Sequence, residues 1–170
     1  EEVAARLKAA VGPFILRRLK RGVLTDLPDK LETSIFARME DEQSKLYHAH
    51  EQALRLSLEK QSDAGWNKGK MQILTELMRL RQLCCDPRLV YDDYTGGSCK
   101  IDMIWDLIST SIDAGAKLLV FSQFTSFLSL IADKLREEHV SFFELTGSTP
   151  KDERVRLVRE FNSDDTPVFL

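Results

Sequence analysis

The sequence of 170 residues has few cysteines and histidines and no long apolar run, and each shortage excludes a class of protein. No apolar run approaches the roughly 20 residues that cross a bilayer, so no membrane partner is expected. Cys84, Cys85 and Cys99 have neither the even count of a disulfide framework nor a Cys-x-x-Cys spacing, which favours inert thiols in a reducing compartment. His48 and His50 lie two apart on an expected helix, so they point to different faces and do not predict a metal site.

The usual signatures of a complete enzyme are also missing. None of the eight glycines belongs to a G-x-x-x-x-G-K-[S/T] loop, the stretch that cradles the triphosphate of ATP in many nucleotide-binding proteins. No Ser–His–Asp order and no paired-carboxylate spacing stands out among the 27 acidic residues. We therefore expect this chain alone to be inactive as an enzyme, with no catalytic residue, cofactor or metal of its own.

Charge is distributed unevenly, although the formal net charge is only -3. Residues 6–30 carry seven basic and two acidic groups, whereas residues 31–170 carry 17 basic and 23 acidic ones. A basic segment beside an acidic body suits contact with a polyanion or with an acidic partner surface. A solvated linker is the alternative interpretation.

The first half of the chain predicts a strand followed by two helices. The strand is expected over 32–39, and the helices over 41–60 and 70–84, with Pro87 ending the second. The expected contact faces of the two helices consist of Leu46, Ala49, Ala53 and Leu56, and of Met71, Leu74, Leu77 or Met78, and Leu80 or Arg81.

The second half alternates strands and helices, which is typical of an α/β fold with a parallel sheet. The continuous apolar run over 118–121 is expected to be a strand covered on both faces. Neither end of the chain carries a cap or a turn, so we expect a piece of a longer protein. The expected elements are a helix over 101–112, a strand over 118–121, a helix over 127–135, a strand over 140–145, a helix over 150–161 and a strand over 167–170.

Two loops of this half could bind phosphate. Ligands of such sheets bind beyond the carboxyl ends of the strands, where residues 122–125 and 146–150 are expected. Both loops place hydroxyl groups and free backbone N–H groups at a helix N-terminus, which attracts phosphate. Simple helix capping is the alternative, because Thr149 followed by Asp152 resembles a capping box.

Five stretches, in order along the chain, carry a more specific resemblance. They are PFILRRLK with LPDK (13–20 and 27–30), LRQLCCDPRL (80–89), SCKI (98–101), LVFSQF (119–124), and ELTGST (144–149) with Arg154 and Phe161-Asn162. Together they closely resemble motifs of the Swi–Snf family of DNA-translocating ATPases, in the second helicase superfamily. Many eukaryotic members have His where this chain has Asp86, so the sequence looks more like a bacterial member.

The resemblance implies a motor of two RecA-like lobes that hydrolyses ATP, with Mg, in the cleft between them. The fold expected here is a partial, truncated RecA-like parallel sheet of the P-loop NTPase type with flanking helices, preceded by a helical insertion. Residues 1–40 would be the exit of the first lobe and a basic linker, residues 41–96 the helical insertion, and residues 97–170 the first half of the second lobe. The remaining strands of that lobe would be missing, so the exposed sheet edge predicts self-association.

The resemblance also implies contacts with the backbone of double-stranded DNA, independent of base sequence, and packing against the rest of the motor. It implies a nuclear location in a eukaryote, or a cytoplasmic, nucleoid-associated one in a bacterium. Arg17 and Arg18 would either contact DNA or form salt bridges between the lobes. The residues expected at the DNA are Ser122, Gln123, Phe124, Thr146, Gly147 and Ser148, together with Arg17 and Arg18.

Two other readings of the sequence compete with this one. The first is a non-catalytic protein-interaction module, built from a helical pair and a small α/β domain, with no motor parent. The second is a small phosphate- or nucleotide-binding protein of the flavodoxin-like type, which the helical insertion at 41–86 fits poorly.

Overall fold

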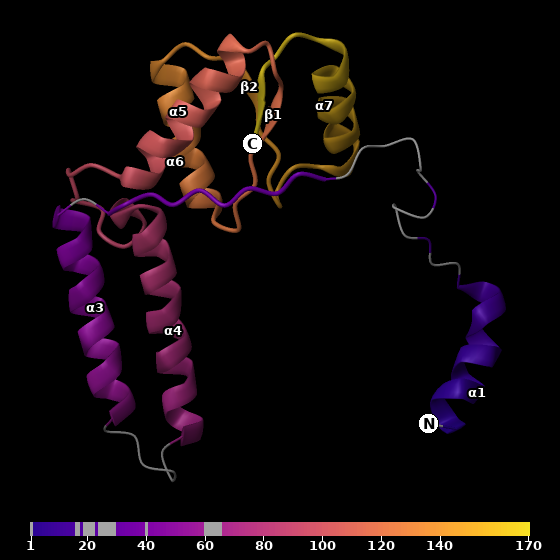
Figure 1. The fold of residues 1–170 in the computed structure, drawn as a ribbon, viewed down its shortest axis with the longest axis horizontal. Helices are drawn as coiled ribbons and strands as arrows, with labels where there is room; N and C mark the ends of the chain where they lie inside the picture. The colour runs from indigo at the N-terminus through magenta and orange to yellow at the C-terminus, as the bar shows by residue number, and fades with distance from the viewer. Residues whose placement is uncertain (1, 16–17, 19–22, 24–29, 40, 60–65) are drawn as a thin grey trace. The chain divides into compact units, whose positions relative to one another are not determined.

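The chain divides into two compact units, Glu1–Ile35 and Phe36–Leu170. In the first unit, helix α1 (Glu2–Val11) is followed by a short 3-10 helix, η1 (Gly12–Phe14), and no residue of α1 is buried. The second unit holds the helical pair and the sheet. The computed structural model (Figure 1) describes residues 2–15, 18, 23, 30–39, 41–59 and 66–170.

The strand predicted over 32–39 is wrong. Residues 30–39 form no regular secondary structure, and both Ile35 and Phe36 are exposed. A strand is held by backbone hydrogen bonds to a neighbouring strand, and an alternating apolar pattern does not supply that neighbour. The three-stranded sheet of the described residues uses other segments, all of them beyond residue 117.

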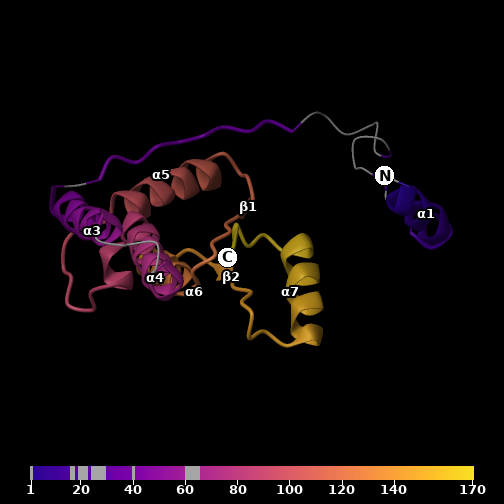
Figure 2. The same ribbon diagram turned by 90° about the horizontal axis from the view of Figure 1, so that it is seen from below.

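The two predicted helices are confirmed as α3 (Asp41–Glu59) and α4 (Trp66–Cys85), which lie side by side in Figures 1 and 2. Their predicted contact faces are largely wrong, however. Two helices alone cover only a narrow strip of each other, so a wider apolar stripe stays in solvent. Of the predicted residues, Leu80 is buried and Leu46 half-buried, and the others are exposed: Ala49, Ala53, Leu56, Met71, Leu74, Leu77, Met78 and Arg81.

Polar side chains add links within the helical pair. The buried Gln43 of α3 donates a hydrogen bond from Nε2 to the carbonyl of Leu83 in α4, at 2.8 Å. His50 of α3 lies between two partners, with Nε2 2.6 Å from the hydroxyl of Tyr91 and Nδ1 3.3 Å from Glu76 Oε2. His50 thus connects α3, α4 and the chain segment that follows α4.

Asp86 lies at the junction between α4 and the next short helix, η3 (Pro87–Leu89), and is fully buried. Its carboxylate accepts hydrogen bonds from the backbone N–H of Arg88 and from the guanidinium of the same residue, at 2.7–2.9 Å. A buried carboxylate is tolerated when it is paired and hydrogen-bonded in this way. The hydrogen bond to Asp86 raises the pKa of Arg88.

The rest of the second unit is the predicted α/β structure. Helix α5 (Cys99–Asp113) precedes β1 (Leu118–Leu119), α6 (Thr125–Glu137) precedes β2 (Phe142–Phe143), and α7 (Lys151–Ser163) precedes β3 (Val168–Phe169). The strands are parallel in the order β1-β3-β2, with Val168 in register with both Leu118 and Phe142. The fold class predicted from the sequence is confirmed.

Helices cover the two faces of this sheet unequally (Figures 1 and 2). Helices α5 and α6 pack on one face around Val168, while Phe161 of α7 packs edge-on against Phe169 on the other, with ring centroids 5.2 Å apart. At the edge strand β1 and just after it, the side chains on this second face stay uncovered, since Leu119 is 59% and Phe121 88% exposed. The prediction that 118–121 is covered on both faces is therefore wrong for its outer face.

Candidate nucleic-acid interface

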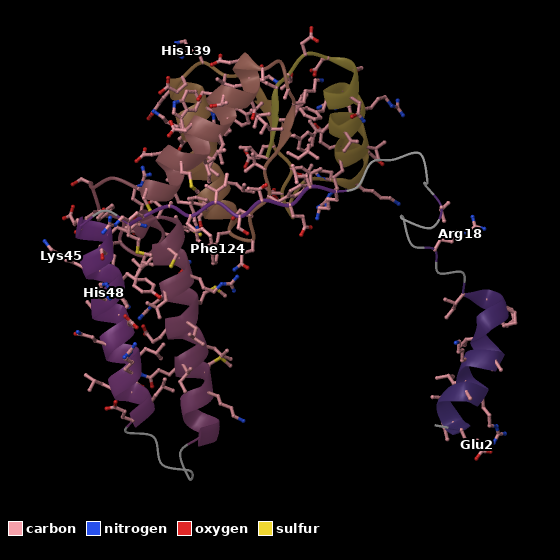
Figure 3. All side chains as sticks on the ribbon, in the orientation of Figure 1. Glu2, Arg18, Lys45, His48, Phe124 and His139 are labelled. Atoms are coloured by element: carbon pink, nitrogen blue, oxygen red, sulfur yellow. The ribbon has the colours of Figure 1, made fainter. Side chains whose placement is uncertain are left out.

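The two predicted loops lie at the same edge of the sheet, because β1 and β2 run parallel. They are not on neighbouring strands, since β3 separates β1 from β2 by two strand spacings, roughly 10 Å. In Figure 3, Phe124 of the first loop and His139, just before β2, lie at opposite ends of the α/β part. The two loops therefore flank the end of β3 at the carboxyl edge.

The loop after β1 is held by contacts from outside the sheet. Ser122 Oγ accepts a hydrogen bond from the backbone N–H of Phe124, at 3.1 Å. The guanidinium of Arg81, in α4, donates to Gln123 Oε1 and lies over the ring of Phe124, 5.9 Å from its centroid. Helix α6 begins at Thr125 without a side-chain cap. Its first N–H groups are thus left without a capping side chain.

The loop after β2 is held by its own helix. The guanidinium of Arg154, in α7, donates to the carbonyls of Thr149, Thr146 and Gly147 at 2.8, 3.0 and 3.0 Å. The hydroxyls of Thr146 and Ser148 are hydrogen-bonded to each other at 2.8 Å. The loop carbonyls are thereby occupied, while the N–H groups of Gly147 and Ser148 have no acceptor among the described residues.

The capping box considered for this loop is wrong. The hydroxyl of Thr149 accepts from the N–H of Thr146 at 3.0 Å, and α7 begins after Pro150 without a side-chain cap. Pro150 is the N-cap residue, one position later than the Thr149 cap that the sequence suggested. At Gly147 a Cβ atom would meet no atom within 4 Å, so the backbone is open to a ligand there.

Other candidate groups belong to other elements or lie outside the described residues. Arg18 is exposed in the first unit, and Arg17 lies outside the described residues. Burial raises the pKa of both the Cys84 and the Cys85 thiol, which keeps them protonated near neutral pH. Over the described ranges, no three His, Cys, Asp or Glu side chains come together in a way that could hold a metal ion. Within the same ranges, no helix is both long and apolar enough to cross a membrane.

The chemistry of this edge suits an oxyanion. Uncapped helix N-termini, free N–H groups and hydroxyls all favour a phosphate. The residues do not fit ATP with Mg, because the loops read SQFT and TGSTP, without the lysine of a phosphate loop.

Sequence reasoning missed two arginines at this edge. The sequence indicates Arg154 only as part of a motif, whereas its contacts with three carbonyls give it a positioning role. Helical periodicity places Arg81 on a helix contact face, yet its side chain reaches Gln123, 42 residues further along the chain. The LRQ stretch that contains Arg81 was the available signal.

The fold is that of a RecA-like motor lobe joined to a helical pair. The solved Sulfolobus solfataricus SWI2/SNF2 ATPase core in complex with dsDNA matches it with a TM-score of 0.75 and 27% identity, over 99% of this chain and 37% of that one.

The chain belongs to the SNF2 family. The SNF2-related domain matches residues 1–89, and the helicase conserved C-terminal domain matches residues 99–170. Among curated relatives, the chromatin structure-remodeling complex subunit snf21 of Schizosaccharomyces pombe is 31% identical over 99% of this chain and 15% of its own length. The nuclear protein STH1/NPS1 of Saccharomyces cerevisiae is 28% identical over 98% of this chain and 13% of its own length. The chain therefore spans only about a seventh of these relatives.

Proposed function

We propose that this chain is a piece of an ATP-dependent double-stranded-DNA translocase, and that it contributes DNA-backbone contacts and packing between motor lobes. Family membership supports the proposal, as does the match to the solved Sulfolobus solfataricus ATPase core in complex with dsDNA. Residues 1–40 would leave the first lobe, 41–96 form the helical insertion, and 97–170 begin the second lobe. The family domains meet between residues 89 and 99, close to the proposed boundary at 96.

The observation that carries the DNA contact is the pair of loops at one sheet edge. N–H groups, hydroxyls and helix N-termini bind phosphate oxygens without reading bases, so binding would depend on salt and not on sequence. Arg18 would add basic charge from the first unit, and so would Arg17, which lies outside the described residues. The loop residues proposed to face the backbone are Ser122, Gln123, Phe124, Thr146, Gly147 and Ser148.

ATP and Mg would act in the parent protein, with the phosphate loop supplied by the first lobe, so this chain alone would hydrolyse no ATP. The exposed groove beside β1, about 430 Å³ in volume and lined by Phe121, Val158 and Phe161 among others, supports packing against the rest of the motor or self-association. The parent would be nuclear in a eukaryote, or cytoplasmic and nucleoid-associated in a bacterium. The bacterial origin suggested by Asp86 stays a prediction.

The test is a salt titration of the 170-residue chain with two duplexes of unrelated sequence. We expect weak, equal binding to both, with log K falling linearly against log salt concentration. Replacing both Thr146 and Ser148 by Ala is expected to weaken binding about five- to 150-fold, since two hydrogen bonds are lost and each is worth about 0.5–1.5 kcal/mol.

The matched control replaces Thr110 and Ser111 by Ala. Their hydroxyls bond to backbone carbonyls of α5, in the last turns before the chain enters β1 at the opposite sheet edge. This pair is expected to leave DNA affinity unchanged. If both pairs of substitutions leave the affinity of a salt-dependent complex unchanged, the loops are not where the backbone binds.

A further inference from the structure

Arg81 connects the helical pair to the loop after β1. Its guanidinium donates to the side-chain oxygen of Gln123 and lies over the ring of Phe124, with 5.9 Å between Cζ and the ring centroid. The hydrogen bond and the ring contact fix the position of a cation directly at the loop that we propose faces DNA. Arg81 is nevertheless exposed.

The charge of Arg81 is not compensated by any carboxylate among the described residues. Most arginines of this unit that form side-chain contacts do pair with a carboxylate. Arg55 pairs with Glu51 at 2.8 Å, Arg79 with Glu76 at 2.9 Å and Arg136 with Asp133 at 2.6 Å, and Arg88 and Arg156 are also paired. Arg81 is instead positioned by a neutral amide and an aromatic ring. That arrangement holds the guanidinium in place without neutralising it.

A guanidinium held in this way keeps unused hydrogen-bond donors. It carries five N–H groups in a planar fork, of which the structure uses one for Gln123. The guanidinium lies over the ring of Phe124, and a cation–π contact of this kind uses none of the N–H donors, so the others can bind phosphate oxygens. The unused donors and the uncompensated charge thus suit one kind of ligand, an oxyanion.

We propose that Arg81 binds a backbone phosphate of duplex DNA, and that Gln123 and Phe124 position its guanidinium for this contact. The inference rests on the proposed function and extends the DNA-binding surface from the sheet edge onto the helical pair. It also gives Gln123 and Phe124 a different role, because they act through Arg81 rather than on the phosphate alone.

The experiment compares the salt dependence of duplex binding for the 170-residue chain and its Arg81→Gln and Arg81→Lys variants. One lost phosphate contact lowers the slope of log K against log salt by about 0.9, and we expect this change for Arg81→Gln together with about three- to tenfold weaker binding at low salt. Arg81→Lys keeps the charge but not the fork, so it is expected to retain the slope and to bind a few-fold more weakly. Arg55→Gln, in the same helical pair, removes one positive charge and is expected to change neither value.

The outcomes separate the two levels of the proposal. If the unaltered chain shows no salt-dependent binding, the proposed function fails, and the inference fails with it. If the chain binds but Arg81→Gln keeps the original slope, Arg81 contacts no phosphate, while the proposed function stands. A purely structural role would lower affinity without changing the slope, and that result would also overturn the inference. If Arg81→Gln does not fold, the affinity of Arg81→Lys for duplex DNA provides the test. An affinity equal to that of the unaltered chain would contradict a phosphate contact that needs the planar guanidinium.

Discussion

The two loops at the carboxyl edge of the sheet are each held by one arginine, but the two arginines come from different places. Arg154 belongs to α7, the helix that directly follows its loop, and it contacts three backbone carbonyls. Arg81 belongs to the helical pair and contacts the side chains of Gln123 and Phe124. One loop is therefore held locally, through its backbone, and the other at long range, through side chains.

This difference predicts different consequences when each arginine is lost. A backbone held at three points loses its shape when the donor is removed, because three carbonyls must find new partners. A loop held through two side chains keeps its backbone and loses only its link to the helical pair. Arg154 is thus expected to matter mainly for stability, and Arg81 for the link between the helical pair and the loop after β1.

The largest expected effect is that of Arg154→Ala. We expect the free energy of unfolding to fall by about 2 kcal/mol, a value reduced from three charged hydrogen bonds because the site is partly exposed. Urea unfolding followed by circular dichroism measures the change. Arg159→Ala is the matched control, since Arg159 is an exposed arginine of the same helix with no carboxylate partner among the described residues. Equal losses for the two variants would show that Arg154 does not hold the loop.

A smaller effect is expected for Gln123→Ala, which removes the acceptor that Arg81 uses. The hydrogen bond is exposed, so the free energy of unfolding is expected to change by no more than about 0.5–1 kcal/mol. The same urea experiment measures it. A loss as large as that of Arg154→Ala would mean that the long-range link, and not only the local one, stabilises the fold.

The local and the long-range link also differ in how far sequence could predict them. The elements of 99–170 were predictable because each carries a complete local signal: an apolar run for Leu118-Leu119, or helical periodicity between turn residues for α6. The predicted strand over 32–39 failed because periodicity says nothing about a partner strand. Arg81 and Gln123 are 42 residues apart, and no local pattern connects them.

The position of the two loops at the sheet edge was only partly predictable. Parallel strands place both loops at one edge, and this followed from the alternation of strands and helices. The strand order did not follow from it, and the insertion of β3 between β1 and β2 separates the loops. The predicted burial of Leu119 and Phe121 was wrong for a related reason. Whether a helix covers a strand depends on where the helix packs and not on the strand's own sequence.

The smallest expected effect is the coupling between the two arginines. Because β3 lies between the loops, and each arginine is hydrogen-bonded to its own loop, their contributions to stability are expected to add. In a double-mutant cycle of Arg81→Gln and Arg154→Ala, the interaction energy is expected to stay within about 0.5 kcal/mol of zero, as for residues without shared partners. The reference is the cycle of Arg81→Gln with Gln123→Ala, whose residues are in direct contact and are expected to couple by about 0.5–1 kcal/mol. If the first cycle matched or exceeded the second, the two loops would act as one unit, and the distinction between a locally held and a remotely held loop would not describe this edge.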